Sequence, residues 1–96
     1  MKVKNMTSNS SGRPVANQFI IDSTEHNPKG DDVPIKTFQS YSTVIAQKRF
    51  GKVTLDRNAW DYSTTTGRYR NQFLGETIKE TRAKIKSGEY ILADLN

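Results

Sequence analysis

The segment from Trp60 to Gly75 holds the side chains of this sequence that are best suited to contact another molecule. It contains four aromatic rings and two arginines, namely Trp60, Tyr62, Arg68, Tyr69, Arg70 and Phe73. Tyrosine, tryptophan and arginine dominate the centres of binding interfaces, although large rings also fill the cores of small domains. Tyr69 and Phe73 lie four residues apart, on one face of a helix, which favours the core for both. Trp60 keeps two possible roles, a lid over the core or an interface residue.

Basic residues form the stronger pattern. Lys79, Arg82 and Lys86 recur at helical spacing and would line one side of a helix. This side is either a solvated face balanced by neighbouring glutamates or a ridge that follows phosphates or acidic groups, extended by other basic residues. Phe50 lies at the tip of a predicted hairpin, away from any predicted core, and is a candidate anchor. The candidate binding residues are therefore Lys48, Arg49, Phe50, Lys52, Trp60, Arg68, Arg70, Lys79, Arg82 and Lys86.

The sequence offers little to a catalytic or metal site. Its one histidine, His26, lies in an acidic turn without the spacing of a known metal site, which favours a solvated loop. The hydroxyls of residues 63–66 precede a predicted helix and are typical of capping residues. A phosphate-binding G-x-x-x-x-G-K-[ST] loop is absent. We therefore expect no enzyme activity, no metal and no cofactor.

Length and charge limit the class of protein. The chain has 96 residues, of which 33% are hydrophobic, a formal net charge of +5 and no cysteine. A chain of this length forms one domain with a modest core, so a partner or a second copy would help to stabilise it and an oligomer is possible. Basic charge favours acidic or polyanionic partners, and the lack of cysteine excludes disulfides and thiolate metal sites. The absence of a signal sequence and of a long apolar run predicts a soluble, cytoplasmic protein that does not contact a membrane.

Strand signals place a small sheet in the middle of the chain. Residues 1–16 are polar and predict a disordered N-terminal arm. Residues 17–23, 35–47 and 52–56 have the composition or alternation of strands, and the last two are spaced as a hairpin. The block 24–34 contains proline and glycine and is expected to break regular structure.

Two helices are predicted to follow the strands. Ser63 is suited to cap the first helix, which Gly75 ends, and a capping box that starts at Thr77 begins a second helix that ends at Gly88. The tail after Gly88 would return to the domain as a short strand or an extended segment. The sequence therefore predicts a single α+β domain of residues 17–96, in which an antiparallel sheet of about three strands packs against two C-terminal helices.

The C-terminal part of the sequence carries a family likeness. The stretch WDYSTTTGRYRNQFLGETIKETRAKIKSGEYILADLN, with FQSYSTVIA before it, resembles small uncharacterised proteins encoded by phages and mobile elements of low-GC Gram-positive bacteria. The resemblance covers roughly residues 17–96 and brings no catalytic motif, so no site residue is carried over from it. It implies a protein that acts by stoichiometric binding to a host machine, including nucleases of the CRISPR type, or to nucleic acid.

These observations lead to three hypotheses about function. The first is a non-enzymatic phage or mobile-element protein of the anti-CRISPR type, which inhibits a host protein or nucleoprotein complex through a basic, aromatic surface. The second is a nucleic-acid-binding protein without sequence preference, whose affinity would fall steeply with salt. The third is a phage structural or assembly component, which would form a defined homo-oligomer.

Overall fold

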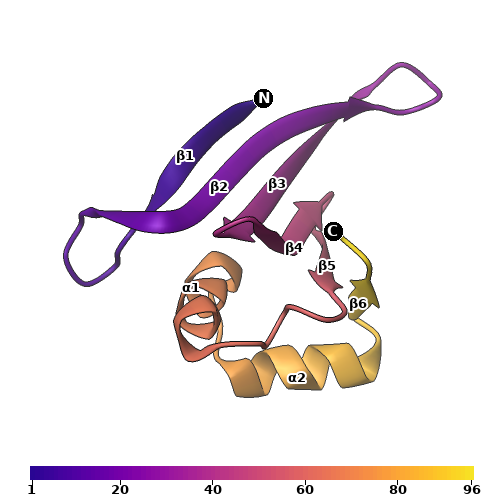
Figure 1. The fold of residues 1–96 in the computed structure, drawn as a ribbon. Coiled ribbons are helices and arrows are strands. Elements are labelled where there is room, and N and C mark those ends of the chain that lie inside the picture. Colours follow the sequence, from indigo (N-terminus) through magenta and orange to yellow (C-terminus); the bar gives the residue numbers. More distant parts are fainter.

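The computed structural model describes residues 1–96, which form one sheet and two short helices (Figure 1). The elements follow the chain in the order β1 (Lys2–Thr7), β2 (Pro14–His26), β3 (Asp32–Ser40), β4 (Thr43–Arg49), β5 (Lys52–Asp56), α1 (Thr64–Leu74), α2 (Ile78–Ser87) and β6 (Tyr90–Ala93).

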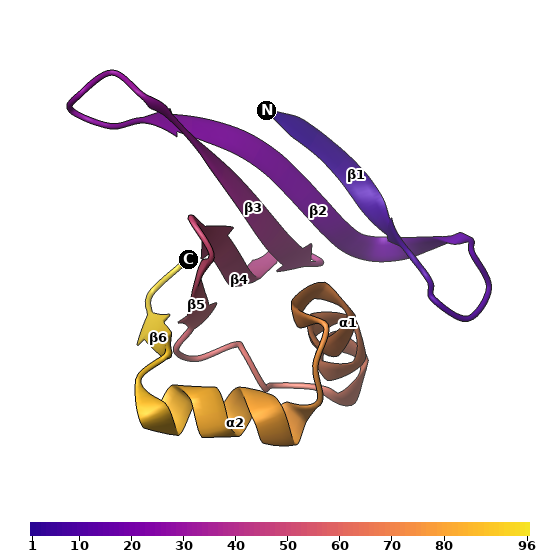
Figure 2. The same cartoon turned by 180° about the vertical axis from the view of Figure 1, so that it is seen from behind.

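The sheet has six strands in the spatial order β1-β2-β3-β4-β5-β6. Neighbouring strands are antiparallel except for β5 and β6, which are parallel. Parallel neighbours need a long crossover connection, and here α1 and α2 provide it. Both helices lie on the same side of the sheet, as the views from front and back show (Figures 1 and 2).

The prediction of an antiparallel sheet of about three strands with a disordered arm is therefore wrong. Residues 2–7 of the expected arm form β1, which pairs with β2. An edge strand needs few apolar side chains, because pairing satisfies its backbone along one side. Two tertiary contacts hold this strand in place: Met6 is 5% exposed in the core, and Gln72 Nε2 of α1 donates to the carbonyl oxygen of Thr7 at 2.6 Å.

The block of residues 24–34 does not break the sheet, because its turn is confined to a few residues. The side chain of Asn27 accepts hydrogen bonds from the backbone N–H groups of Lys29 and Asp31, each at 3.0 Å. Side-chain closure of this kind is typical of asparagine in turns. As a result β2 and β3 stay paired from Gln18 opposite Ser40 to His26 opposite Asp32.

The helix boundaries agree with the sequence prediction. Ser63 Oγ accepts the N–H of Thr66, and Thr77 forms a complete capping box with Glu80. Both helices end at a glycine with a left-handed backbone, which a residue without a Cβ adopts at little cost. In the β4–β5 turn, Phe50 has φ 52° and Gly51 φ 73°, as expected for a tight hairpin whose two central residues both take positive φ.

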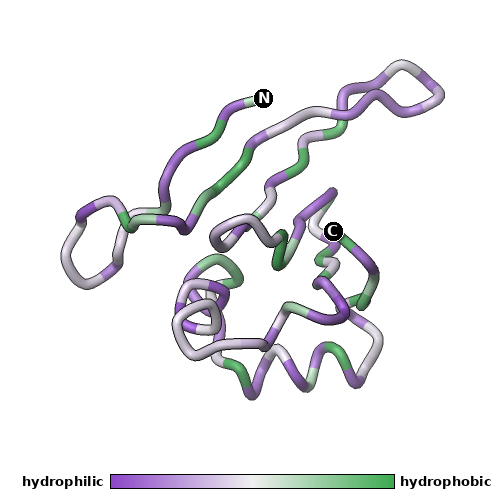
Figure 3. The backbone as a smooth tube through the Cα atoms, viewed as in Figure 1, coloured by the Kyte–Doolittle hydropathy of each residue, from purple (hydrophilic) through white to green (hydrophobic).

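One face of the sheet, here called the helix-covered face, carries the core. A single row of paired residues, Ile20, Phe38, Ala46, Leu55 and Leu92, crosses it from β2 to β6. The ring centroid of Phe73 in α1 lies 5.7 Å from that of Phe38. The longest hydrophobic stretch of the tube lies in the middle of β2, with shorter ones on other strands and on both helices (Figure 3). Full burial of each large apolar side chain contributes about 1.5–3 kcal/mol to folding.

Candidate binding surface at the junction of α1 and α2

The loop between β5 and α1, which carries the aromatic segment, is fixed by a buried carboxylate. Asp56 accepts hydrogen bonds from the backbone N–H groups of Asn58, Ala59 and Leu95, the last at 2.8 Å. Burial alone would raise the pKa of this carboxyl, but the hydrogen bonds outweigh that effect and hold the pKa below its ordinary value. The loop and the C-terminal tail are therefore anchored at one ionised group.

Asp61 joins three segments of the chain at the start of this surface. One of its carboxylate oxygens lies 3.2 Å from Arg70 of α1, and the other lies 3.3 Å from Arg82 of α2. The side chain of Arg70 is 1% exposed, whereas that of Arg82 is 62% exposed. Asp61 therefore pairs with one arginine that belongs to the interior and one that faces solvent.

Arg70 acts as an internal brace. Its guanidinium donates to the carbonyl oxygen of Trp60 at 2.7 Å and to the side chain of Asn71 at 3.0 Å, and it lies 5.3 Å from the centroid of the Trp60 ring. Gly67, one turn earlier in α1, leaves room for it, because a Cβ there would stand 3.4 Å from the guanidinium. These contacts give both Arg70 and Trp60 a structural role.

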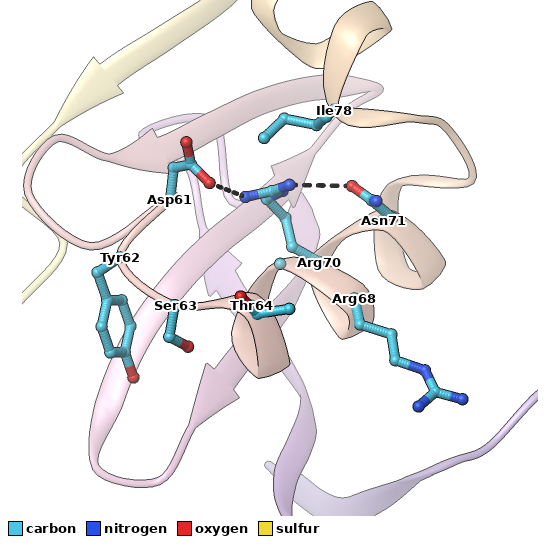
Figure 4. A pocket seen from close by; sticks show the side chains of 9 residues that line it. Asp61, Tyr62, Ser63, Thr64, Arg68, Arg70, Asn71 and Ile78 are labelled. Carbon is cyan, nitrogen blue, oxygen red and sulfur yellow. Dashed lines mark hydrogen bonds and ion pairs between the residues drawn. The ribbon is translucent and has the colours of Figure 1, made fainter.

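An open pocket of about 620 Å³ lies over this brace and at the N-terminal end of α1 (Figure 4). Tyr62, which is 50% exposed, and Arg68 are its exposed aromatic and cationic residues. Figure 4 shows the Arg70 guanidinium between Asp61 and Asn71, while the Arg68 side chain extends away from them. The pocket therefore has a hydrogen-bonded wall and an exposed cation beside it.

The predicted basic stripe lies on the exposed side of α2. Lys79, Arg82 and Lys86 are all exposed, and neither lysine takes part in an ion pair. The two neighbouring glutamates bond to other groups: Glu80 closes the capping box, and Glu76 accepts from Lys84 at 2.8 Å. Lys79 and Lys86 therefore have no ion-pair partner, and Arg82 has one, Asp61.

Glu76 is the centre of a polar cluster on the opposite side of α2. It also accepts from Thr81 and from the hydroxyl of Tyr90, both at 2.6 Å. Burial acts to raise the pKa of Glu76, but hydrogen bonds from Lys84, Thr81 and Tyr90 lower it below its usual range. Burial and the bond to Glu76 raise the pKa of Tyr90 to about 12. This cluster attaches α2 to β6.

The candidate residues of the β4–β5 hairpin form a separate group. Lys48 is half-buried, donates to the carbonyl oxygen of Phe73 at 2.6 Å, and has its pKa lowered by burial and then by Lys36. Arg49 pairs with Glu25. Phe50 is 68% exposed and lines hollows formed with β2 and β3, not with the helices, and Lys52 is exposed beside it.

The structure thus divides the ten predicted binding residues by role. Exposed residues of the α1–α2 surface are Arg68, Lys79, Arg82 and Lys86, whereas Trp60, Arg70 and Lys48 are held by intramolecular contacts. Sequence reasoning missed Asp61, which organises the surface. It named Tyr62, the exposed ring of this surface, in the aromatic segment but did not include it among the ten binding residues. Asp61 gave no signal in the sequence, because its two partners lie 9 and 21 residues away on different helices.

His26 forms a pair with Asp32 across the β2–β3 ladder, with Nδ1 2.6 Å from Oδ1, and both side chains are exposed. The structure has no group of three or more histidine, aspartate or glutamate residues arranged to hold a metal ion. It also has no helix that is long and apolar enough to cross a membrane.

Fold and surface together define a small α+β protein with a mixed sheet, one helical layer and a basic helix exposed to solvent. The chain belongs to a family of unknown function, DUF8033, whose model matches residues 1–90. The match includes β1 and the first turn. No curated protein and no solved structure matches the chain.

Proposed function

We propose that this protein is a non-enzymatic binding protein of a phage or mobile element, which inhibits a cytoplasmic host protein or nucleoprotein complex in the manner of an anti-CRISPR protein. The observation that carries the proposal is the exposed stripe of Lys79, Arg82 and Lys86 on α2, with Arg68 on the neighbouring helix. Such a positive surface raises the association rate with acidic partners and fixes their orientation.

The contacts of this surface suit it to protein recognition. Arg82 is held by Asp61, which is itself held by the buried Arg70, so part of the surface is ordered before a partner arrives. Ordering of this kind reduces the entropy lost on binding. Lys79 and Lys86 flank Arg82 on the same helix face and have no internal partner to give up. A carboxylate of the partner could therefore pair with Lys79 or Lys86 without first breaking an ion pair within this chain.

The test is capture from host lysate, with and without nuclease treatment. The variant combines Lys79→Glu, Arg82→Gln and Lys86→Glu, and the matched control combines Lys2→Glu, Lys4→Gln and Lys29→Glu, which changes the net charge equally at exposed positions without ion pairs. We expect the α2 variant to lose the captured protein while the control retains it, with both folded by circular dichroism. Equal capture by wild type and α2 variant would contradict the proposal.

A second candidate function is binding of single-stranded nucleic acid, favoured by the half-exposed ring of Tyr62 and the cation of Arg68, which line the same pocket. Aromatic rings next to cations can stack bases while the cations neutralise phosphates. A salt titration with a fluorescent oligonucleotide distinguishes the two functions. An affinity that falls by orders of magnitude between low and moderate salt would support nucleic-acid binding, and no binding at low salt would exclude it.

A further inference from the structure

The face of the sheet opposite the helices, here called the open face, carries two rows of uncharged side chains. The first row crosses all six strands and consists of Val3, Ile21, Thr37, Gln47, Thr54 and Ile91. The second row crosses β1 to β4 and consists of Asn5, Phe19, Gln39 and Val44. None of these side chains is charged, although 26% of all residues in the chain are.

The absence of charge from these two rows contrasts with the adjacent row on the helix-covered face, which is charged. One position along each strand, Lys2, Asp22, Lys36 and Lys48 stand opposite one another across β1 to β4. A solvated sheet face is normally rich in charged and polar side chains. The open face instead combines threonine, asparagine and glutamine with valine, isoleucine and phenylalanine.

Apolar side chains at both ends of the first row reach solvent. Val3 on the edge strand β1 is 57% exposed, and Ile91 on the other edge strand β6 is 55% exposed. Between them Ile21 and Phe19 are half-buried by their neighbours alone, because both helices lie on the other side. The two central rows of the open face are therefore apolar and neutral and have no internal cover. The next row on this face, Ser23, Ile35, Arg49 and Lys52, borders them with charge, of which Arg49 is paired with Glu25.

We propose that a second copy of this chain covers the open face, by packing sheet against sheet in a symmetric dimer. Two molecules that each carry a net charge of +5 repel one another, and the uncharged central rows are where two copies can approach with the least repulsion. In a two-fold dimer the same patch meets itself, and neutral rows of apolar and short polar side chains are self-complementary in this arrangement.

Charge also distinguishes the partner proposed for the open face, a second copy of the chain, from the acidic partner proposed for α2. The two central rows of the open face offer no charge to an acidic protein or a nucleic acid, whereas Lys79, Arg82 and Lys86 on the opposite side of the molecule attract such a partner. Burying apolar surface would add to the modest core of a 96-residue chain. In a dimer of this kind, α2 of each protomer would still face solvent.

The oligomeric state of the wild-type chain, measured by light scattering and sedimentation at micromolar concentrations, is the first test. We expect a dimer, and a double variant Val3→Lys, Ile91→Lys should weaken self-association by about tenfold or more, because it buries charges at both ends of the interface. The matched control is Tyr41→Lys, Phe50→Lys, which adds the same charge at residues 57% and 68% exposed in turns. The control should remain dimeric.

A crosslinking test reports the geometry directly, because the chain has no cysteine of its own. Gln47 lies near the middle of the first row, so Gln47→Cys in a two-fold dimer places two thiols close to the symmetry axis. We expect it to form a disulfide-linked dimer faster than Lys79→Cys on α2. A monomeric wild type, a dimer equally sensitive to the turn variants, or faster crosslinking through position 79 would each overturn the proposal.

Discussion

The two faces of the sheet use neighbouring residues of the same strands in opposite ways. On β5, Val53 and Leu55 point toward the helices and are 8% and 0% exposed, while Thr54 between them points to the open face and is only partly covered. The helix-covered face combines apolar packing with ionised groups, including the Glu76 cluster and the Arg70 brace. Its stability therefore depends on charge, whereas the open face carries none in its two central rows.

The largest expected difference between the two faces is in the loss of stability when a lysine is introduced on one side of β5 or on the other. Val53→Lys buries an ammonium group without a partner and should cost about 4 kcal/mol or more, enough to unfold a domain of this size. Thr54→Lys on the open face should cost less than about 1 kcal/mol. Circular dichroism and thermal melts check this pair. A folded Val53→Lys protein would mean that the helices cover the sheet less tightly than the structure shows.

The next effect concerns the brace beneath the basic surface. Arg70→Met should destabilise the chain by about 2–3 kcal/mol, because it leaves the Trp60 carbonyl without its donor and Asp61 with only one cation. Arg68→Met, two residues earlier and exposed, should change stability by less than about 0.5 kcal/mol. Urea titrations of both variants measure the difference. Equal midpoints would assign Arg70 to binding instead of folding.

Acid should act on α2 and β6 before it acts on β1 to β3. The pKa values of Glu76 and Asp56 are lowered in the folded state, so their contribution to stability is complete above their ordinary pKa and is lost as pH falls through the folded value. Hydrogen exchange at decreasing pH should show α2 and β6 losing protection before β1 to β3. Glu76→Gln should reduce the acid dependence and cost about 1–3 kcal/mol at neutral pH.

The smallest effect is expected at the one charged hairpin residue that faces the helices. Lys48→Met loses the hydrogen bond to the Phe73 carbonyl but also removes the burial penalty that lowers the pKa of Lys48, so stability should change by less than about 1 kcal/mol. Lys52→Met at an exposed position is the control. If capture from lysate falls for Lys48→Met while stability is unchanged, Lys48 belongs to the binding surface after all.

Local signals in the sequence were sufficient for the helices. The cap at Ser63, the capping box at Thr77 and the glycines at positions 75 and 88 are each decided within one turn of chain, so the sequence alone specified where α1 and α2 begin and end. The same holds for Tyr69 and Phe73, whose spacing predicts a shared helix face that packs on the core. Proximity in sequence made these features predictable.

Strands depend on partners that are distant in the sequence, and here the prediction fell short. The polar residues of β1 have little apolar character of their own and become a strand only because β2 offers a paired edge. The parallel position of β6 follows from the crossover made by both helices. Strand number and sheet order were therefore decided by tertiary structure.

The candidate site divides in the same way. The stripe of Lys79, Arg82 and Lys86 follows from helical periodicity, and the sequence determined it. Only the tertiary structure decided which arginine is exposed: Arg70 and Arg82 look alike in the sequence and both pair with Asp61, but Arg70 is buried and bonded to Trp60. Periodicity is a property of the backbone, whereas burial is a property of what the folded chain places around a residue.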